Sequence, residues 1–203
     1  DITFVVDNSA NGAVDLTNIK SQISNYINEI NRPVVDFNLK LVSYDTSGNV
    51  SVGQYDSSQL SNFVTDLNSI TTQAAADHFN MQDFINTLDS SNTTHIDFRN
   101  DANKYALVFT GMSMDGNSTS TADPSGYINA LKNAGVKTSV ITDKNYYYNG
   151  DSTSEPGWTS ITTATGGKLY DINSTDYGSL LTTIAMDNVN DGTSLVQQSN
   201  NIV

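Results

Sequence analysis

The chain alternates between two hydrophobic periods. Short apolar runs predict strands, and stretches in which apolar residues recur every three or four positions predict amphipathic helices. The predicted strands cover residues 2–6, 37–41, 50–53, 105–109, 136–141 and 169–172. The predicted helices cover residues 16–30, 60–70, 81–88, 124–134, 158–164 and 177–184. Strands and helices therefore follow one another along most of the sequence.

This alternation predicts an α/β fold, a three-layer α/β/α sandwich around a mostly parallel six-stranded sheet. Ser47-Gly48-Asn49 forms a turn signal between two alternating segments, so the strand after it is expected to be a short, half-exposed antiparallel edge. Asp15 is a candidate N-cap, Pro124 a candidate first helical residue, and Gly135 a helix stop. We expect residues 1–185 to form one domain and residues 186–203 a polar C-terminal extension or linker.

Composition limits the partners. Nine basic against 22 acidic residues give a net charge of −13 over 203 residues, which disfavours nucleic acid and anionic membranes. The absence of cysteine excludes disulfides and thiolate zinc sites. No apolar run is long enough to cross a bilayer, and no signal peptide is expected within these residues. Since the sequence starts directly in a predicted strand, we expect a piece of a longer extracellular or cell-surface protein.

Oxygen-bearing side chains follow the first predicted strand. Asp7, Ser9 and Asn11 occupy alternate positions in the loop between this strand and the first helix. The carboxyl ends of strands are where open α/β sheets bind ligands. A carboxylate, a hydroxyl and an amide in one loop could hold a hard cation such as Mg²⁺. The alternative is that Asp7 and Ser9 only tie the loop to the first turn of the helix.

Several segments resemble the von Willebrand factor type A domain of bacterial surface proteins. DITFVVDNSANG resembles its opening strand and first metal loop, and AAADHFNMQDFINTL its second loop and following helix. FRNDANKYALVFTGMS resembles its fourth-strand segment, and ATGGKLYDI its late Thr-Gly-Gly signature. The resemblance covers about residues 1–185 and implies a Rossmann-like sheet with one antiparallel edge strand.

The resemblance also implies a metal-ion-dependent adhesion site, but its residues are incomplete here. Asp7 and Ser9 match the family pattern, whereas Asn11 stands where a second serine is expected. His78 occupies the position of a second-loop threonine, and Gly111 that of a third-loop aspartate. We therefore expect Asp7, Ser9 and Asn11 to be a vestigial metal site and no cofactor to bind. Mg²⁺ or Ca²⁺ bound there is the open alternative.

Other residues leave further alternatives open. Asp77 or Asp115 could supply the missing carboxylate, and a hydrolase using Asp7 and His78 is a disfavoured reading. His95 has Asp97 nearby, but no serine elbow accompanies the pair, so a catalytic triad is not expected.

Two more segments could carry a site. Residues 187–192 resemble a calcium loop only faintly, and a polar helix end or linker is the preferred interpretation. Tyr146-Tyr147-Tyr148 with Trp158 could form an aromatic interaction surface, or could cover the sheet edge.

The function expected from these observations is non-enzymatic. The chain would be an adhesion, protein-interaction or structural module of a bacterial cell-surface or secreted protein, binding a protein or glycan ligand. Self-assembly within a larger protein stays open, whereas nucleic-acid binding and membrane insertion are not expected. The alternative function is metal-dependent adhesion, in which a divalent cation at Asp7, Ser9 and Asn11 binds an acidic group of a partner.

Overall fold

The computed structural model describes residues 1–9, 13–32, 35–44, 49–72, 80–111, 124–142, 157–171, 173 and 176–200. The strands are β1 (Ile2–Val6), β2 (Asn38–Tyr44), β3 (Val50–Asp56), β4 (Lys104–Phe109), β5 (Val136–Thr142) and β6 (Leu169–Asp171). The helices are α1 (Ala13–Ile30), α2 (Leu60–Ser69), α3 (Met81–Asn86), α4 (Ser125–Ala134), α6 (Gly157–Thr165) and α7 (Tyr177–Asn200), with the 3-10 turn η1 (Ser57–Gln59) before α2.

The strands form one six-stranded sheet in the order β3-β2-β1-β4-β5-β6. Strand β1 pairs in parallel with both β2 and β4, and the parallel pairing continues through β5 to β6. Strand β3 alone runs antiparallel, at the edge beside β2. The predicted mostly parallel sheet with one antiparallel edge strand is therefore confirmed.

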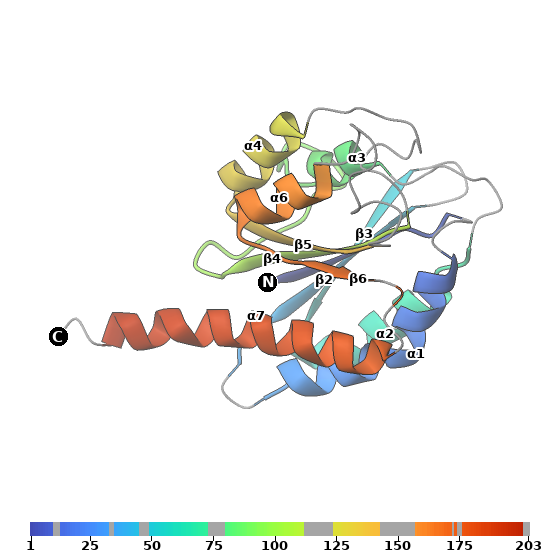
Figure 1. The fold of residues 1–203 in the computed structure, drawn as a ribbon, viewed down its shortest axis with the longest axis horizontal. Coiled ribbons are helices and arrows are strands. Elements are labelled where there is room, and N and C mark those ends of the chain that lie inside the picture. Colours follow the sequence, from blue (N-terminus) through green and yellow to red (C-terminus); the bar gives the residue numbers. More distant parts are fainter. Residues whose placement is uncertain are drawn as a thin grey trace.

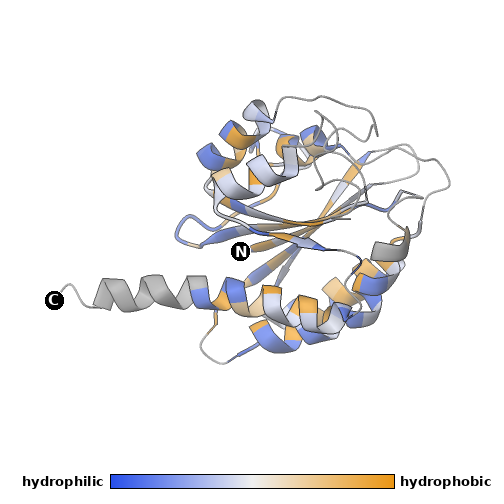
Figure 2. Cartoon of the chain, in the orientation of Figure 1, coloured by the Kyte–Doolittle hydropathy of each residue, from blue (hydrophilic) through white to orange (hydrophobic). Residues whose placement is uncertain are grey.

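Helices cover both faces of the sheet, which gives the three predicted layers (Figure 1). Helices α1, α2 and α7 lie on one face, and α3, α4 and α6 on the other. Figure 2 shows that orange apolar positions of the helices lie mainly toward the sheet and blue polar positions mainly toward solvent. Because β1 is covered on both sides, all five of its residues are buried.

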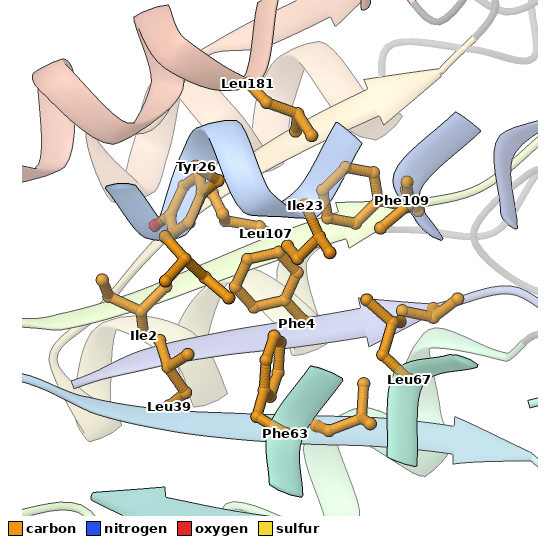
Figure 3. Close-up of a cluster of buried hydrophobic side chains, with 14 of the residues drawn as sticks. Ile2, Phe4, Ile23, Tyr26, Leu39, Phe63, Leu67, Leu107, Phe109 and Leu181 are labelled. Atoms are coloured by element: carbon orange, nitrogen blue, oxygen red, sulfur yellow. The ribbon is translucent and has the colours of Figure 1, made fainter. Parts of the chain in front are cut away.

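Phe4 occupies the centre of the larger core (Figure 3). Its ring packs edge-on against Tyr26 of α1 and Phe63 of α2, with centroids 5.1 and 5.2 Å away. It also stacks on Phe109 of the neighbouring strand at 5.7 Å. One side chain of β1 thus joins two helices and two strands, and this fixes the position of the loop that follows β1.

Three element ends differ from the sequence expectation. Helix α1 already begins at Ala13, so Asp15 lies inside its first turn rather than at the N-cap. Pro124 is itself the N-cap of α4, which begins one residue later. Strand β3 has seven residues and is not short, because Tyr55 extends it by packing into the core at 7% exposure. Gly135 ends α4 in the left-handed conformation, as predicted.

Helix α7 continues well beyond the predicted domain boundary. Residues 186–203 were expected to be a polar extension or linker, and those up to Asn200 are helical. The far end of α7 extends past the sheet in Figure 1. The position of the domain boundary stays a prediction. None of the helices in the described ranges is both long and apolar enough to cross a membrane.

Polar contacts hold the middle of α7 against the body of the domain. Asp187 accepts hydrogen bonds from Lys168 Nζ at 2.7 Å and from Tyr170 Oη at 2.8 Å. The next residue, Asn188, donates from Nδ2 to the buried hydroxyl of Tyr26 at 2.9 Å. A buried donor that lost such a partner would cost about 1–3 kcal/mol, so these contacts define where α7 sits on α1 and β6.

Candidate functional site

The candidate site lies at the carboxyl ends of β1 and β4, where the parallel pairing brings two loops together. Asp7 directly follows β1, and its backbone N–H donates to the carbonyl oxygen of Phe109 at 2.9 Å. Thr110 directly follows β4, and its N–H donates to Ile141 of β5 at 3.1 Å. The sheet ladder therefore continues one step beyond the strands and sets Asp7 and Thr110 side by side.

The carboxylate of Asp7 is buried, with the residue only 1% exposed. Its Oδ1 accepts the backbone N–H of Ser9 at 2.9 Å. Its Oδ2 accepts the hydroxyl of Thr110, also at 2.9 Å. Donors from two loops thus hold both oxygens, which orients the carboxylate and offsets part of the cost of burying a charge.

Two more polar side chains beside Asp7 are buried. Asn8 donates from Nδ2 to the carbonyl oxygens of Tyr44 at 2.7 Å and Thr71 at 3.2 Å, which ties the loop to the end of β2 and to the segment after α2. Ser9 is 1% exposed, and its Oγ has no hydrogen-bond partner among the described residues. The Oδ1 of Asn8 is also buried and likewise has no hydrogen-bond partner among the described residues.

Tyr44 borders this acidic end of the sheet. Burial raises the pKa of its hydroxyl, and the carboxylates of Asp83 and Asp7 raise this pKa further. The ring is 3% exposed, and its Oη donates to the carbonyl oxygen of Asn80 at 3.4 Å. Tyr44 therefore stays neutral at physiological pH and adds no negative charge beside Asp7.

The described residues do not supply a complete cation site. Mg²⁺ requires a near-octahedral set of oxygens, usually including one or two carboxylates. Here Asp7 gives one carboxylate and Ser9 one hydroxyl, whereas Gly111, beside Thr110, has no side chain to contribute. The described part of the chain holds no group of three histidine, cysteine or acidic residues that could bind a metal.

Several predicted site residues lie outside the described residues. These are Asn11, Asp77, His78, Asp115 and Tyr146–Tyr148. The vestigial site at Asp7, Ser9 and Asn11 therefore stays a prediction. Of these three residues, the structure places Asp7 and Ser9 next to each other.

Three other candidates can be placed. Trp158 is 1% exposed and packs in the core, so it cannot belong to an exposed aromatic surface. Residues 187–192 lie within α7, which agrees with a polar helix and excludes a calcium loop. His95 contacts Asp97 through Nε2 at 3.0 Å and the carbonyl oxygen of Asn92 through Nδ1 at 2.8 Å, so both ring nitrogens are engaged within its own loop.

Sequence reasoning missed two residues that build the site, Asn8 and Thr110. Asn8 sits between the two residues of the metal pattern, and its role depends on partners 36 and 63 positions away. Thr110 contacts a carboxylate 103 positions away. One usable signal exists, because polar residues that end adjacent parallel strands must meet at the same edge of the sheet.

Comparison with known proteins identifies the fold and the family. The model of the von Willebrand factor type A domain matches residues 1–187. The structure of BatB from Bacteroides thetaiotaomicron is similar with a TM-score of 0.61 and 14% identity, covering 95% of this chain and 98% of that one. An aerotolerance-related membrane protein from Bacteroides fragilis is similar with a TM-score of 0.57 and 12% identity, covering 93% and 98%.

A third similar structure comes from outside bacteria. Proximal thread matrix protein 1 of the mussel byssus has a TM-score of 0.58 and 16% identity, over 91% of this chain and 46% of that one. A further structure of that protein, at 13% identity and a TM-score of 0.56, is described as having a zinc-occupied MIDAS motif. No curated protein matches the sequence. Since the family model covers nearly the whole chain, the chain belongs to the von Willebrand factor type A domain family.

Proposed function

We propose that the chain is a non-enzymatic interaction or structural module whose metal-ion-dependent adhesion site has degenerated. Domains of this family are generally interaction modules. The observation that carries the proposal is Gly111, which follows Thr110 at the point where Thr110 contacts the carboxylate of Asp7. A second carboxylate at this position would complete the acidic ligands, and a glycine supplies none.

The arrangement around Asp7 supports a structural role for the remaining carboxylate. Its two oxygens accept hydrogen bonds from Ser9 and Thr110, so it joins the two loops without a cation. We propose that the module acts outside the cell or at a bacterial cell surface, where it holds a protein or glycan partner. The net charge of −13 supports a partner that is not nucleic acid.

A second candidate function, metal-dependent adhesion, is favoured by one observation. The Oγ of Ser9 is buried and has no hydrogen-bond partner among the described residues. The hydroxyls of Thr3, Thr138 and Thr142 are buried in the same way, so the position of Ser9 beside Asp7 is what distinguishes it. A cation or an ordered water could satisfy its Oγ. In this alternative a divalent cation at Asp7, Ser9 and Asn11 would bind an acidic group on the partner.

Gly111→Asp separates the two functions. Under our proposal, Mg²⁺ leaves the thermal midpoint of the wild-type chain unchanged and raises that of Gly111→Asp, because the variant regains the second carboxylate. Saturating Mg²⁺ at 100 times its Kd would stabilise the variant by about 2.7 kcal/mol. Differential scanning calorimetry with Mg²⁺ or EDTA measures the shift.

Asp7→Asn on the Gly111→Asp background is the control, and it should remove the effect of Mg²⁺. A wild-type chain whose midpoint rises with Mg²⁺, and whose Asp7→Asn variant does not respond, would support metal-dependent adhesion and contradict the proposed degeneration.

A further inference from the structure

The two edges of the sheet differ in how far they are protected. Strand β6 has three residues and directly follows Lys168, and short strands and lysines are the usual protection of a sheet edge. Strand β3 has seven residues, with no proline, lysine or arginine among them. All seven pair with β2 on the inner side. Within the residues that the structure describes, the β3 edge therefore lacks the proline, lysine and short length that usually prevent another strand from pairing with an edge.

The backbone groups on the outer side of β3 also lack backbone partners within the described part of the chain, although Asp97 N–H donates to the side-chain Oε1 of Gln54 at 2.9 Å. The backbone of β3 makes no backbone hydrogen bond there other than those of the ladder with β2. The one side-chain bond to its backbone lies at the end of the strand, where Asp56 N–H donates to Gln59 Oε1 at 3.1 Å. Unpaired N–H and C=O groups along an extended edge are a template for strand addition.

Charge around this edge is mainly negative. Two lysines lie near it: Lys40 of β2, which pairs with Gln54 of β3 and is only 4% exposed, and Lys20, whose Nζ donates to the carbonyl oxygen of Ile70 after α2. From Leu41 to Phe98 the sequence contains no lysine or arginine, and it contains seven aspartates. This segment supplies β3, α2, α3 and most of β2. Asp56 and Asp97, at one end of β3, are both exposed. A second copy of this chain would present the same negative charge, whereas a basic segment would be attracted.

A polar groove of about 490 Å³ runs beside β3 on the face covered by α2. Ser43, Ser51, Asp66 and Ser69 line it. Gly53 makes room for the Tyr55 hydroxyl at this groove, because a β-carbon on residue 53 would lie only 2.2 Å from that hydroxyl. That hydroxyl donates to Asp66 Oδ2 at 2.7 Å. A carboxylate among hydroxyls suits a lysine or arginine side chain.

The opposite face of β3 is apolar. Val50 and Val52 are half-buried there and pack against the core under α3 and α4. Since side chains of a strand alternate between faces, an added strand would point every second residue toward the groove and the others toward these valines.

We propose that β3 is a docking edge for an extended, basic segment of a partner protein, which pairs with β3 as an additional strand of the sheet. Basic side chains of this segment would alternate with apolar ones, the basic ones lying over the groove at Asp66. One end of the groove adjoins the loop of Asp7, because Asn8 and Tyr44 also line it. The proposed pairing runs along the backbone of β3 and requires no cation, so the inference goes beyond the proposed function.

A synthetic peptide tests the docking edge. The probe is a fluorescent seven-residue peptide of alternating lysine and valine, which matches the length of β3. Fluorescence anisotropy should show saturable binding to the whole chain, and amide shifts in NMR spectra should be largest within residues 50–56. N-methylation of all backbone amides of the peptide, which leaves its charge unchanged and blocks both of its edges, should weaken binding at least about tenfold because the edge hydrogen bonds are lost.

Two protein variants of equal charge provide the matched control. Ser51→Lys places a cation on the edge strand, whereas Ser61→Lys places it on the exposed surface of α2. Ser51→Lys should weaken peptide binding by about tenfold and Ser61→Lys by much less. Equal binding of the N-methylated peptide, equal effects of the two variants, or no binding at all would overturn the proposal, as would a stable dimer of the chain formed through β3.

Discussion

Gly167→Ala is expected to destabilise the fold by about 3 kcal/mol or more, the upper range for forcing an atom into a packed site. A β-carbon on Gly167 would lie 1.8 Å from the carbonyl oxygen of Thr138 and 2.3 Å from its carbonyl carbon. These are backbone atoms of β5, so relief requires a shift of the strand. The Gly167 N–H also donates to Thr162 of α6 at 2.8 Å, which fixes it from the other side. Urea denaturation followed by circular dichroism measures the loss.

Gly126→Ala is the matched control for this variant. Gly126 lies in the first turn of α4, is exposed, and has no atom within 4 Å of a β-carbon placed there. Alanine should leave stability unchanged or raise it by up to about 1 kcal/mol, because glycine is the poorer helix former. If Gly167→Ala changed the free energy of unfolding as little as Gly126→Ala, the segment before β6 could not lie as close to β5 as described.

Phe4→Ala is expected to cost about 3–5 kcal/mol of the free energy of unfolding, the usual range for removing a buried phenylalanine ring. Phe4 is fully buried, and its ring contacts Tyr26, Phe63 and Phe109 from three different elements. Those neighbours belong to α1, α2 and β4, so their shared backbone constraints limit how far the cavity can collapse. The midpoint and slope of urea denaturation give the change.

Phe4→Leu separates the loss of the ring from the loss of volume. Leucine keeps most of the apolar volume, so it should cost about 1–2 kcal/mol. A cost below about 1 kcal/mol for Phe4→Ala would contradict the central position of Phe4 shown in Figure 3.

Most of the fold could be predicted because hydrophobic burial has a simple period in this chain. The continuous apolar run at 105–109 predicted a strand buried on both faces, and β4 lies in the middle of the sheet. The turn signal at 47–49 predicted the hairpin of β2 and β3. Burial of apolar side chains determines where these strands form, and the sequence shows which side chains are apolar.

The predicted and observed helix ends differ where burial of apolar side chains does not determine the structure. The part of α7 beyond Met186 is polar, so it has no apolar stripe to reveal a helix. The start of α1 at Ala13 depends on local backbone geometry, which hydrophobic periodicity does not report.

The site was predictable only in part. Asp7 and Ser9 could be found from their spacing after the first strand, and the structure places both in a buried loop. The roles of Asn8 and Thr110 could not be predicted in this way, because both residues act through hydrogen bonds to residues far away in the sequence. The contact between Thr110 and Asp7 follows from the pairing of β1 with β4, which places the loops after the two strands together.

The fold and the candidate cation site therefore differ in how closely they follow the family pattern. The sheet and the two helical layers have the architecture of the family. At the carboxyl ends of β1 and β4 the described residues offer one carboxylate, held by hydrogen bonds from its own loops.

The most direct measurement is anomalous X-ray diffraction from crystals of the chain soaked in Mn²⁺, which binds octahedral oxygen sites like Mg²⁺ and is visible by its anomalous signal. Our account predicts no anomalous peak beside Asp7 and Ser9, and a peak there in crystals of Gly111→Asp soaked in the same way. An octahedral Mn²⁺ bound by oxygens of Asp7 and Ser9 in the wild-type chain would contradict it.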